Sequence, residues 1–198
     1  MKFFWFAILF FASFAHAQVS VYGSLQTAFA PWSKSGINLN WVGAGSGTCA
    51  GGTDEIRMFP DDSQVAVIEW ATMDLVESVS PQDHIECIEY LISYLQVNRP
   101  AVKRVVVVNA PPAAKGNNFP FPAGTITSDA VAAYNQLYST LPDQFPGGYV
   151  QLADMRGILW ISQYARPPYM NGKYGIIFGS HSSSNWDYFF SQIKRAMN

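Results

Sequence analysis

Runs of β-branched and aromatic residues alternate along the chain with stretches of helical spacing. The clearest runs predict five strands, over residues 19–22, 37–42, 64–70, 104–109 and 149–153. Residues 105–108 are four consecutive valines, and such a run is typical of a parallel strand that is buried on both faces. Strands separated by helical segments indicate βα units, so we predict a mainly parallel sheet.

Helical spacing and capping residues predict three main helices. Between the third and fourth strands, Ser80 is suited to cap a helix, Pro81 to occupy its first position and Asp83 its first turn. A second helix is predicted over residues 128–141, and a last one begins near Ser183 or Ser184. The apolar residues expected on the inner faces of the first and last helices are Ile85, Ile88, Leu91, Ile92, Leu95, Trp186, Phe189, Phe190, Ile193 and Met197. Together with the strands, these helices predict a flavodoxin-like three-layer α/β/α sandwich with five parallel strands.

The first residues are typical of a secretory signal peptide. Lys2 precedes an apolar run over residues 3–11, and small residues flank a predicted cut after Ala17. The run is shorter than the roughly 20 residues that a membrane helix needs, which makes a retained anchor the weaker interpretation. We therefore predict removal of residues 1–17, one domain over residues 18–198, and a secreted or periplasmic location.

Charge and cysteine content narrow the partners and the compartment. Fourteen acidic residues stand against twelve basic ones, and no segment gathers Lys or Arg. Nucleic acid and anionic membrane surfaces are therefore not expected as partners. Export would place Cys49 and Cys87 where a disulfide persists. We predict that they are bonded, because the helices after the second and third strands should share a face of the sheet; two free buried thiols are the alternative.

Histidine is scarce beyond the predicted signal peptide, where only His84 and His181 occur. His84 falls in the first turn of a charged amphipathic helix, so an exposed structural role is expected for it. His181 stands in a loop before the last helix, where its side chain can project over the edge of the sheet. Ser24 follows the first strand at a turn that Gly23 makes sterically easy, at the edge where ligands of such sheets bind. A serine hydroxyl needs an adjacent base, and Ser24 with His181 is the candidate pair.

These segments resemble the sequence blocks of the SGNH (GDSL-like) hydrolase family over nearly the whole mature chain. Residues 22–25, Tyr-Gly-Ser-Leu, resemble Gly-Asp-Ser-Leu, and residues 43–47 resemble the block with the oxyanion glycine. Residues 67–74 stand in the place of Gly-x-Asn-Asp, and residues 179–181 in the place of Asp-x-x-His. The resemblance implies hydrolysis of an acyl or acetyl ester by Ser24, with His181 as general base and the Ser24 and Gly45 amides as oxyanion donors.

The chain departs from the family at two functional positions. The acid three residues before the histidine is Phe178 here, and the oxyanion asparagine is Met73. We expect both side chains to border the substrate, with Asp74 or Asp187 as candidate replacements for the acid. Some members of the family work with a Ser-His dyad and a backbone carbonyl. The alternative to a working esterase is a decayed SGNH-fold module that binds glycan or a protein partner.

Other motifs are weaker. The spacing Gly45-x-Gly47-x-x-Ala50 matches a relaxed dinucleotide fingerprint, but such matches are common and exported proteins rarely meet that cofactor. The Gly-x-Ser-x-Gly elbow of α/β-hydrolases is absent. Two distant histidines without a paired-cysteine motif predict no metal site. We therefore expect no cofactor, and a small-molecule, lipid or acetylated-glycan ester as substrate.

Overall fold

The computed structural model describes residues 17–24, 27–28, 30–44, 47–111, 127–157 and 184–198. Five strands form one parallel sheet in the order β2-β1-β3-β4-β5, which is the order of flavodoxin-like folds. The prediction of five parallel strands is confirmed, with ends that differ by two residues at most. The strands are β1 (Val19–Gly23), β2 (Leu39–Ala44), β3 (Val65–Glu69), β4 (Arg104–Val108) and β5 (Val150–Ala153).

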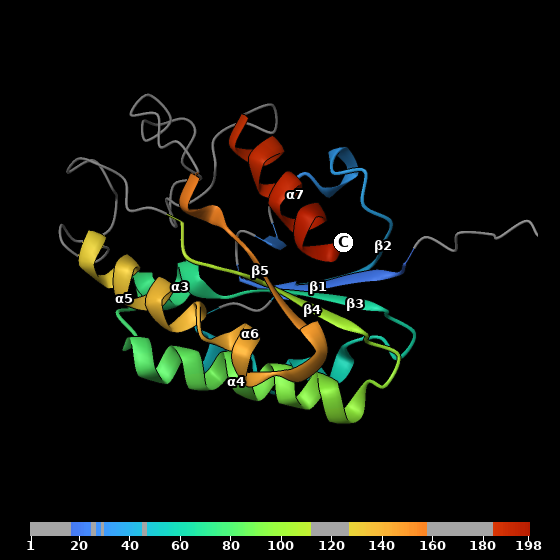
Figure 1. Cartoon of the computed structure of the whole chain (residues 1–198), viewed down its shortest axis with the longest axis horizontal. Coiled ribbons are helices and arrows are strands. Elements are labelled where there is room, and N and C mark those ends of the chain that lie inside the picture. The colour runs from blue at the N-terminus through green and yellow to red at the C-terminus, as the bar shows by residue number, and fades with distance from the viewer. Residues whose placement is uncertain (1–16, 25–26, 29, 45–46, 112–126, 158–183) are drawn as a thin grey trace, which may run out of the picture.

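Helices cover both faces of the sheet, so the predicted three-layer sandwich is confirmed (Figure 1). The long helix α4 (Pro81–Asn98) and α5 (Ser128–Tyr138) lie on one face, and α7 (Ser184–Met197) lies on the other. The short helices are α2 (Cys49–Gly52), α3 (Ala71–Val76) and α6 (Leu141–Gln144). Single 3-10 turns span Trp32–Lys34, Glu55–Met58, Pro146–Gly148 and Met155–Gly157.

Side chains of the central strands alternate between two hydrophobic cores. Val105 and Val107 of β4 belong to the core beneath α4 and α5, while Val106 and Val108 belong to the core beneath α7. All four are buried because parallel strands with helices on both faces have no solvent-facing side. The apolar residues predicted from helical spacing fill these cores, and in α7 they are Trp186, Phe189, Phe190 and Ile193.

The predicted start of α4 is also confirmed. Ser80 Oγ accepts a hydrogen bond from the Asp83 amide at 3.1 Å, and Pro81 occupies the first turn, where its missing N–H costs nothing. Cys49 and Cys87 form a disulfide with a Cα–Cα distance of 6.2 Å. This bond ties α2 to α4 on one face of the sheet, as the sequence predicted.

The chain enters the sheet directly after the predicted cleavage point. The carbonyl oxygen of Gln18 accepts hydrogen bonds from the amides of Gln64 (2.9 Å) and Val65 (3.1 Å). The predicted signal peptide falls outside the described residues except for Ala17. Within the described segments, no helix is both long enough and apolar enough to cross a bilayer.

Candidate active site

Ser24 lies at the carboxyl edge of the sheet, directly after β1. Gly23, the last residue of β1, stands in register with Glu69, the last residue of β3. The Ser24 amide continues this pairing and donates to the Glu69 carbonyl oxygen at 2.7 Å. The Ser24 carbonyl oxygen then accepts from the Ala28 amide at 3.2 Å, the i→i+4 bond of a helical turn. Ser24 therefore lies at a turn directly after β1, and the sequence had led us to expect a strand-to-loop turn there without a helical bond.

Gly23 permits this turn because two groups press against its Cα. A Cβ atom at this position would lie 2.3 Å from the Glu69 carbonyl oxygen and 2.3 Å from Thr27 Oγ1. Both separations are far below van der Waals contact, and one of the two atoms belongs to the backbone of β3. The glycine before Ser24 thus lets the serine turn approach the end of β3.

The Ser24 side chain is bonded to a buried carboxylic acid. Its hydroxyl donates to Glu69 Oε2 at 2.6 Å, and the Thr72 amide approaches Glu69 Oε1 at 3.4 Å. The Ser24 residue is 0% exposed and Glu69 is 1% exposed. Burial is the main cause that raises the pKa of Glu69, and the nearby Asp74 charge raises it further, while the bonds from Ser24 and Thr72 oppose this.

Glu69 was not singled out by the sequence analysis, although a signal for it exists. The residue sits inside a predicted buried strand, where an acid is costly unless it is hydrogen-bonded. An acid at the end of such a strand, next to a strand that ends in a serine, indicates a polar pair at the carboxyl edge.

A second buried polar cluster joins Asp74, His84 and Tyr138, and it corrects the expectation that His84 is exposed. His84 is 1% exposed; its Nδ1 lies 2.5 Å from Asp74 Oδ2 and its Nε2 lies 2.6 Å from the Tyr138 hydroxyl. The ring also stacks on Tyr134, with centroids 4.5 Å apart. The physical reason is helical spacing: position 84 lies on the same stripe of α4 as Ile88, one turn later.

Asp74 is held from two sides. Its Oδ1 accepts the Cys49 amide at 2.7 Å, while its Oδ2 faces His84. The carboxyl group thus links α3 to the first residue of α2 and to α4. For Asp74 to orient His181, it would have to give up its contacts with the Cys49 amide and His84.

The remaining predicted site residues fall into two groups. Met73 is buried in α3, just beyond the carboxyl end of β3, and Asp187 is exposed in the first turn of α7. Gly45, Phe178 and His181 lie outside the described residues. Among the residues that the structure describes, no cluster of His, Cys, Asp or Glu has an arrangement that could hold a metal ion.

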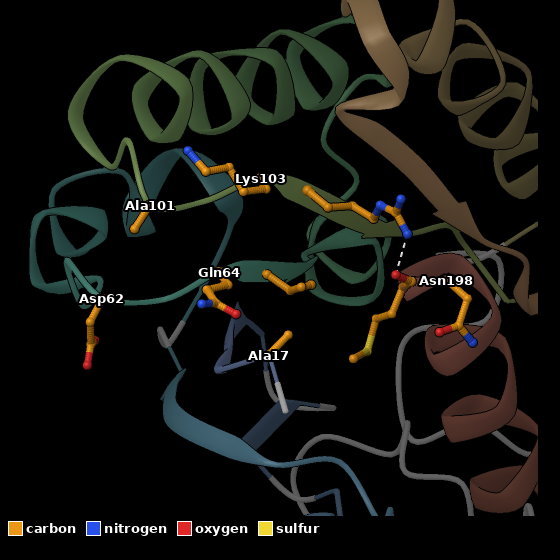
Figure 2. A pocket seen from close by; sticks show the side chains of 9 residues that line it. Ala17, Asp62, Gln64, Ala101, Lys103 and Asn198 are labelled. Atoms are coloured by element: carbon orange, nitrogen blue, oxygen red, sulfur yellow. Dashed lines mark hydrogen bonds between the residues drawn. The ribbon is translucent and has the colours of Figure 1, made fainter. Parts of the chain in front are cut away.

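A separate hollow of about 730 Å³ lies at the opposite edge of the sheet (Figure 2). Val65 and Arg104 begin β3 and β4, so this hollow is at the amino ends of the strands, whereas Ser24 follows the carboxyl end of β1. The Arg104 guanidinium donates to the Met197 carbonyl oxygen there and fixes the end of α7. The hollow is not part of the Ser24 site. Its lining residues are Ala17, Asp62, Gln64, Val65, Ala101, Lys103, Arg104, Met197 and Asn198.

Comparisons with known proteins find similarity in structure. No family model matches the chain, and no curated protein sequence matches it. A Streptococcus pneumonia protein provisionally named a platelet activating factor has a TM-score of 0.73 at 12% identity, over 95% of this chain and 87% of that one. A GDSL-like lipase from Bacteroides thetaiotaomicron has a TM-score of 0.63 at 16% identity, over 92% and 88%. AlinE4, an SGNH-hydrolase family esterase, has a TM-score of 0.52 at 17% identity, over 93% and 97%. At these identities the similarity concerns the fold.

Proposed function

We propose that this chain, which has the fold of the SGNH hydrolases, hydrolyses a carboxylic ester through Ser24. The observation that carries the proposal is the position of Ser24 at the turn after β1, at the carboxyl edge of a sheet with flavodoxin-like strand order. Ligands of open parallel sheets bind at this edge. The GDSL-like lipase and the esterase AlinE4 share the fold, which supports ester chemistry for this chain.

In the proposed reaction, Ser24 Oγ attacks the ester carbonyl carbon and His181 acts as general base, as a Ser-His dyad. The Gly45 amide is a proposed oxyanion donor. The Ser24 amide can join it only if the oxyanion displaces the Glu69 carbonyl oxygen, since the two are bonded at 2.7 Å. Met73 and Phe178 would border the substrate, which we propose to be a small ester, a lipid ester or an acetylated glycan.

We also propose that the protein acts outside the cytoplasm, as a single domain over residues 18–198. The Cys49–Cys87 disulfide supports an oxidising compartment. The bonds from the Gln64 and Val65 amides to the Gln18 carbonyl oxygen support cleavage after Ala17, because Gln18, the residue after the predicted cut, is already tied to the start of β3. The mass of the protein recovered from an exporting host tests this, with loss of residues 1–17 expected.

One observation favours a second function. The Ser24 side chain has no exposed surface, and both its amide and its hydroxyl donate to Glu69. A serine held in this way suits the alternative from the sequence, a non-catalytic module that binds glycan or a protein partner. In that case Ser24 and Glu69 fasten β1 to β3 and do no chemistry.

Ester turnover by the purified mature protein separates the two functions. The panel contains short-chain aryl esters, longer acyl esters and acetylated glycans, and the variant is Ser24→Ala. Ser20→Ala is a matched control, because Ser20 is also buried on β1 and its hydroxyl lies 2.6 Å from Ser63 Oγ. Loss of turnover in Ser24→Ala but not in Ser20→Ala supports the hydrolase. Equal turnover in the native protein and Ser24→Ala favours the non-catalytic binding module over the hydrolase.

A further inference from the structure

In this structure the Ser24 hydroxyl donates its hydrogen bond to Glu69 Oε2. The hydroxyl-to-carboxyl distance of 2.6 Å falls within the range of roughly 2.6–3.2 Å required of a general base. The backbone bond between the same two residues fixes this geometry, because the Ser24 amide is tied to the Glu69 carbonyl oxygen. Both residues are buried, which limits the rotation of their side chains.

We propose that Glu69 is a second general base for Ser24, so that activation of the serine does not depend on His181 alone. This inference rests on the proposed ester hydrolysis at Ser24. The SGNH family has an acid where this chain has Phe178. Here a carboxylate, that of Glu69 at the end of β3, is bonded directly to the serine hydroxyl.

Glu69 can accept and return a proton in both halves of the reaction. As Ser24 Oγ forms a bond to the ester carbonyl carbon, its proton passes to Glu69 Oε2. The tetrahedral intermediate then breaks its bond to the alcohol oxygen, which takes the proton from Glu69 and leaves as the free alcohol. In the second half, water loses a proton to Glu69 while attacking the acyl-enzyme carbon, and the carboxylic acid leaves as the proton returns to Ser24.

The surroundings of Glu69 suit a base more than a permanent anion. Asp74 from α3 adds negative charge nearby, and the pKa of Tyr138 from α5 is raised mainly by burial and further by the charge of Glu69. Removal from water raises the pKa of Glu69 above that of an ordinary glutamate. A base whose pKa lies closer to the operating pH accepts a proton more effectively in the transition state.

The test measures how fast Ser24 reacts with a covalent label, in addition to ester turnover. An alkyl fluorophosphonate forms a P–O bond to Ser24 Oγ as the P–F bond breaks and fluoride leaves, with the proton going to the base, and intact mass reports the adduct. Native protein, Glu69→Gln and His181→Ala are labelled over a range of pH. Glu77→Gln is the control, since Glu77 is an exposed acid that follows α3. Folding of each variant is checked by circular dichroism.

We expect labelling to fall about 100-fold or more in Glu69→Gln, to persist in His181→Ala, and to stay unchanged in Glu77→Gln. A folded Glu69→Gln that is labelled at the native rate overturns the inference while leaving the proposed function intact, and so does loss of labelling in His181→Ala. Glu69-dependent labelling without ester turnover counts against the proposed function and shows only that Glu69 activates the Ser24 hydroxyl. No labelling of Ser24 in the native protein overturns the inference.

If Glu69→Gln does not fold, the pH dependence of the labelling rate in His181→Ala tests the inference instead. A labelling rate that rises with pH to a plateau shows a titrating base other than His181 and supports Glu69, whereas a rate that rises in proportion to hydroxide reflects ionisation of Ser24 itself and overturns the inference. A rate that no longer changes with pH overturns the inference.

Discussion

The hydroxyl oxygen of Tyr138 lies 2.6 Å from Nε2 of His84, although the two residues are 54 positions apart in the sequence. The contact joins α5 to α4 inside the core. All three groups of the cluster are satisfied when Tyr138 donates to Nε2 and the Nδ1 proton is donated to Asp74. Buried polar networks of this kind contribute to a unique packing only while every member has its partner.

Replacement of His84 should therefore be costly. His84→Phe keeps an aromatic ring but leaves a buried carboxyl group facing an apolar side chain, and we expect a loss of about 3–5 kcal/mol in the free energy of unfolding. Tyr138→Phe removes one hydroxyl and should cost about 1–3 kcal/mol. Urea unfolding at neutral pH measures both values.

The control for this pair is Glu86→Gln, which changes an exposed acid on the same helix. It should alter the free energy of unfolding by about 0.5 kcal/mol or less. If His84→Phe is no more destabilising than this control, the cluster has no role in stability.

The fold could be predicted from the sequence because the signals that determine its elements are local. Four consecutive valines predict a strand buried on both faces, and Val105 to Val108 alternate between the two cores. Ser80 and Pro81 predict where α4 begins, since a capping side chain and a missing N–H act within one turn. The strand ends moved by one or two residues, because the last pairs of a ladder depend on neighbouring strands.

The site was harder to predict from the sequence because its contacts join residues that are far apart in the chain. Ser24 could be placed from Gly23 and the end of β1, but its partner Glu69 is 45 positions away, and only the register between β1 and β3 brings them together. His84 was assigned to the surface from its charged neighbours. Its position one turn before Ile88, on the buried side of α4, indicated instead that it is buried.

Loss of the disulfide should lower stability without changing the fold. Cys49 and Cys87 are 38 positions apart, and the entropy of closing such a loop in the unfolded chain corresponds to about 4 kcal/mol. We expect the double variant Cys49→Ser/Cys87→Ser to lose about 2–4 kcal/mol in the free energy of unfolding. Reducing agent should destabilise the native protein and leave the double variant unaffected. Equal sensitivity of both proteins would argue against the bond.

Gly23→Ala should disturb the serine turn. Its Cβ would overlap the Glu69 carbonyl oxygen and Thr27 Oγ1, so the end of β1 must move, at a cost of about 1–3 kcal/mol or more. Gly51→Ala is the matched control, because a Cβ there would meet only Thr48 Oγ1 at 3.8 Å, an ordinary contact. Thermal unfolding of the two variants measures the difference, and similar midpoints would contradict the close approach at Gly23.

Burial of Glu69 makes stability depend on pH. Its pKa in the folded protein is raised above the ordinary value of 4.5, mainly by burial, so the folded state holds this proton more tightly than the unfolded state does. The resulting stabilisation is complete below about pH 4.5 and is lost as the pH rises through the folded-state pKa. Glu69→Gln cannot titrate, so the stability of the native protein should decline relative to this variant as the pH rises above about 4.5. Parallel curves of unfolding free energy against pH would show that Glu69 is not perturbed.

The SGNH hydrolases carry an acid three residues before their histidine, where this chain has Phe178. Phe178→Asp would introduce such an acid, which on the proposed mechanism would orient the His181 ring and stabilise its protonated form. We expect kcat for ester hydrolysis to rise by about tenfold or more, since loss of the orienting acid costs several powers of ten in serine hydrolases. Phe178→Asn supplies a side chain of the same size without charge, and it should give little of this gain. An apolar-to-acid change can also destabilise the domain, so thermal unfolding is recorded for both variants. A folded Phe178→Asp with the native kcat, measured where Ser24→Ala is inactive, would show that His181 is not limiting and would leave Glu69 as the principal base.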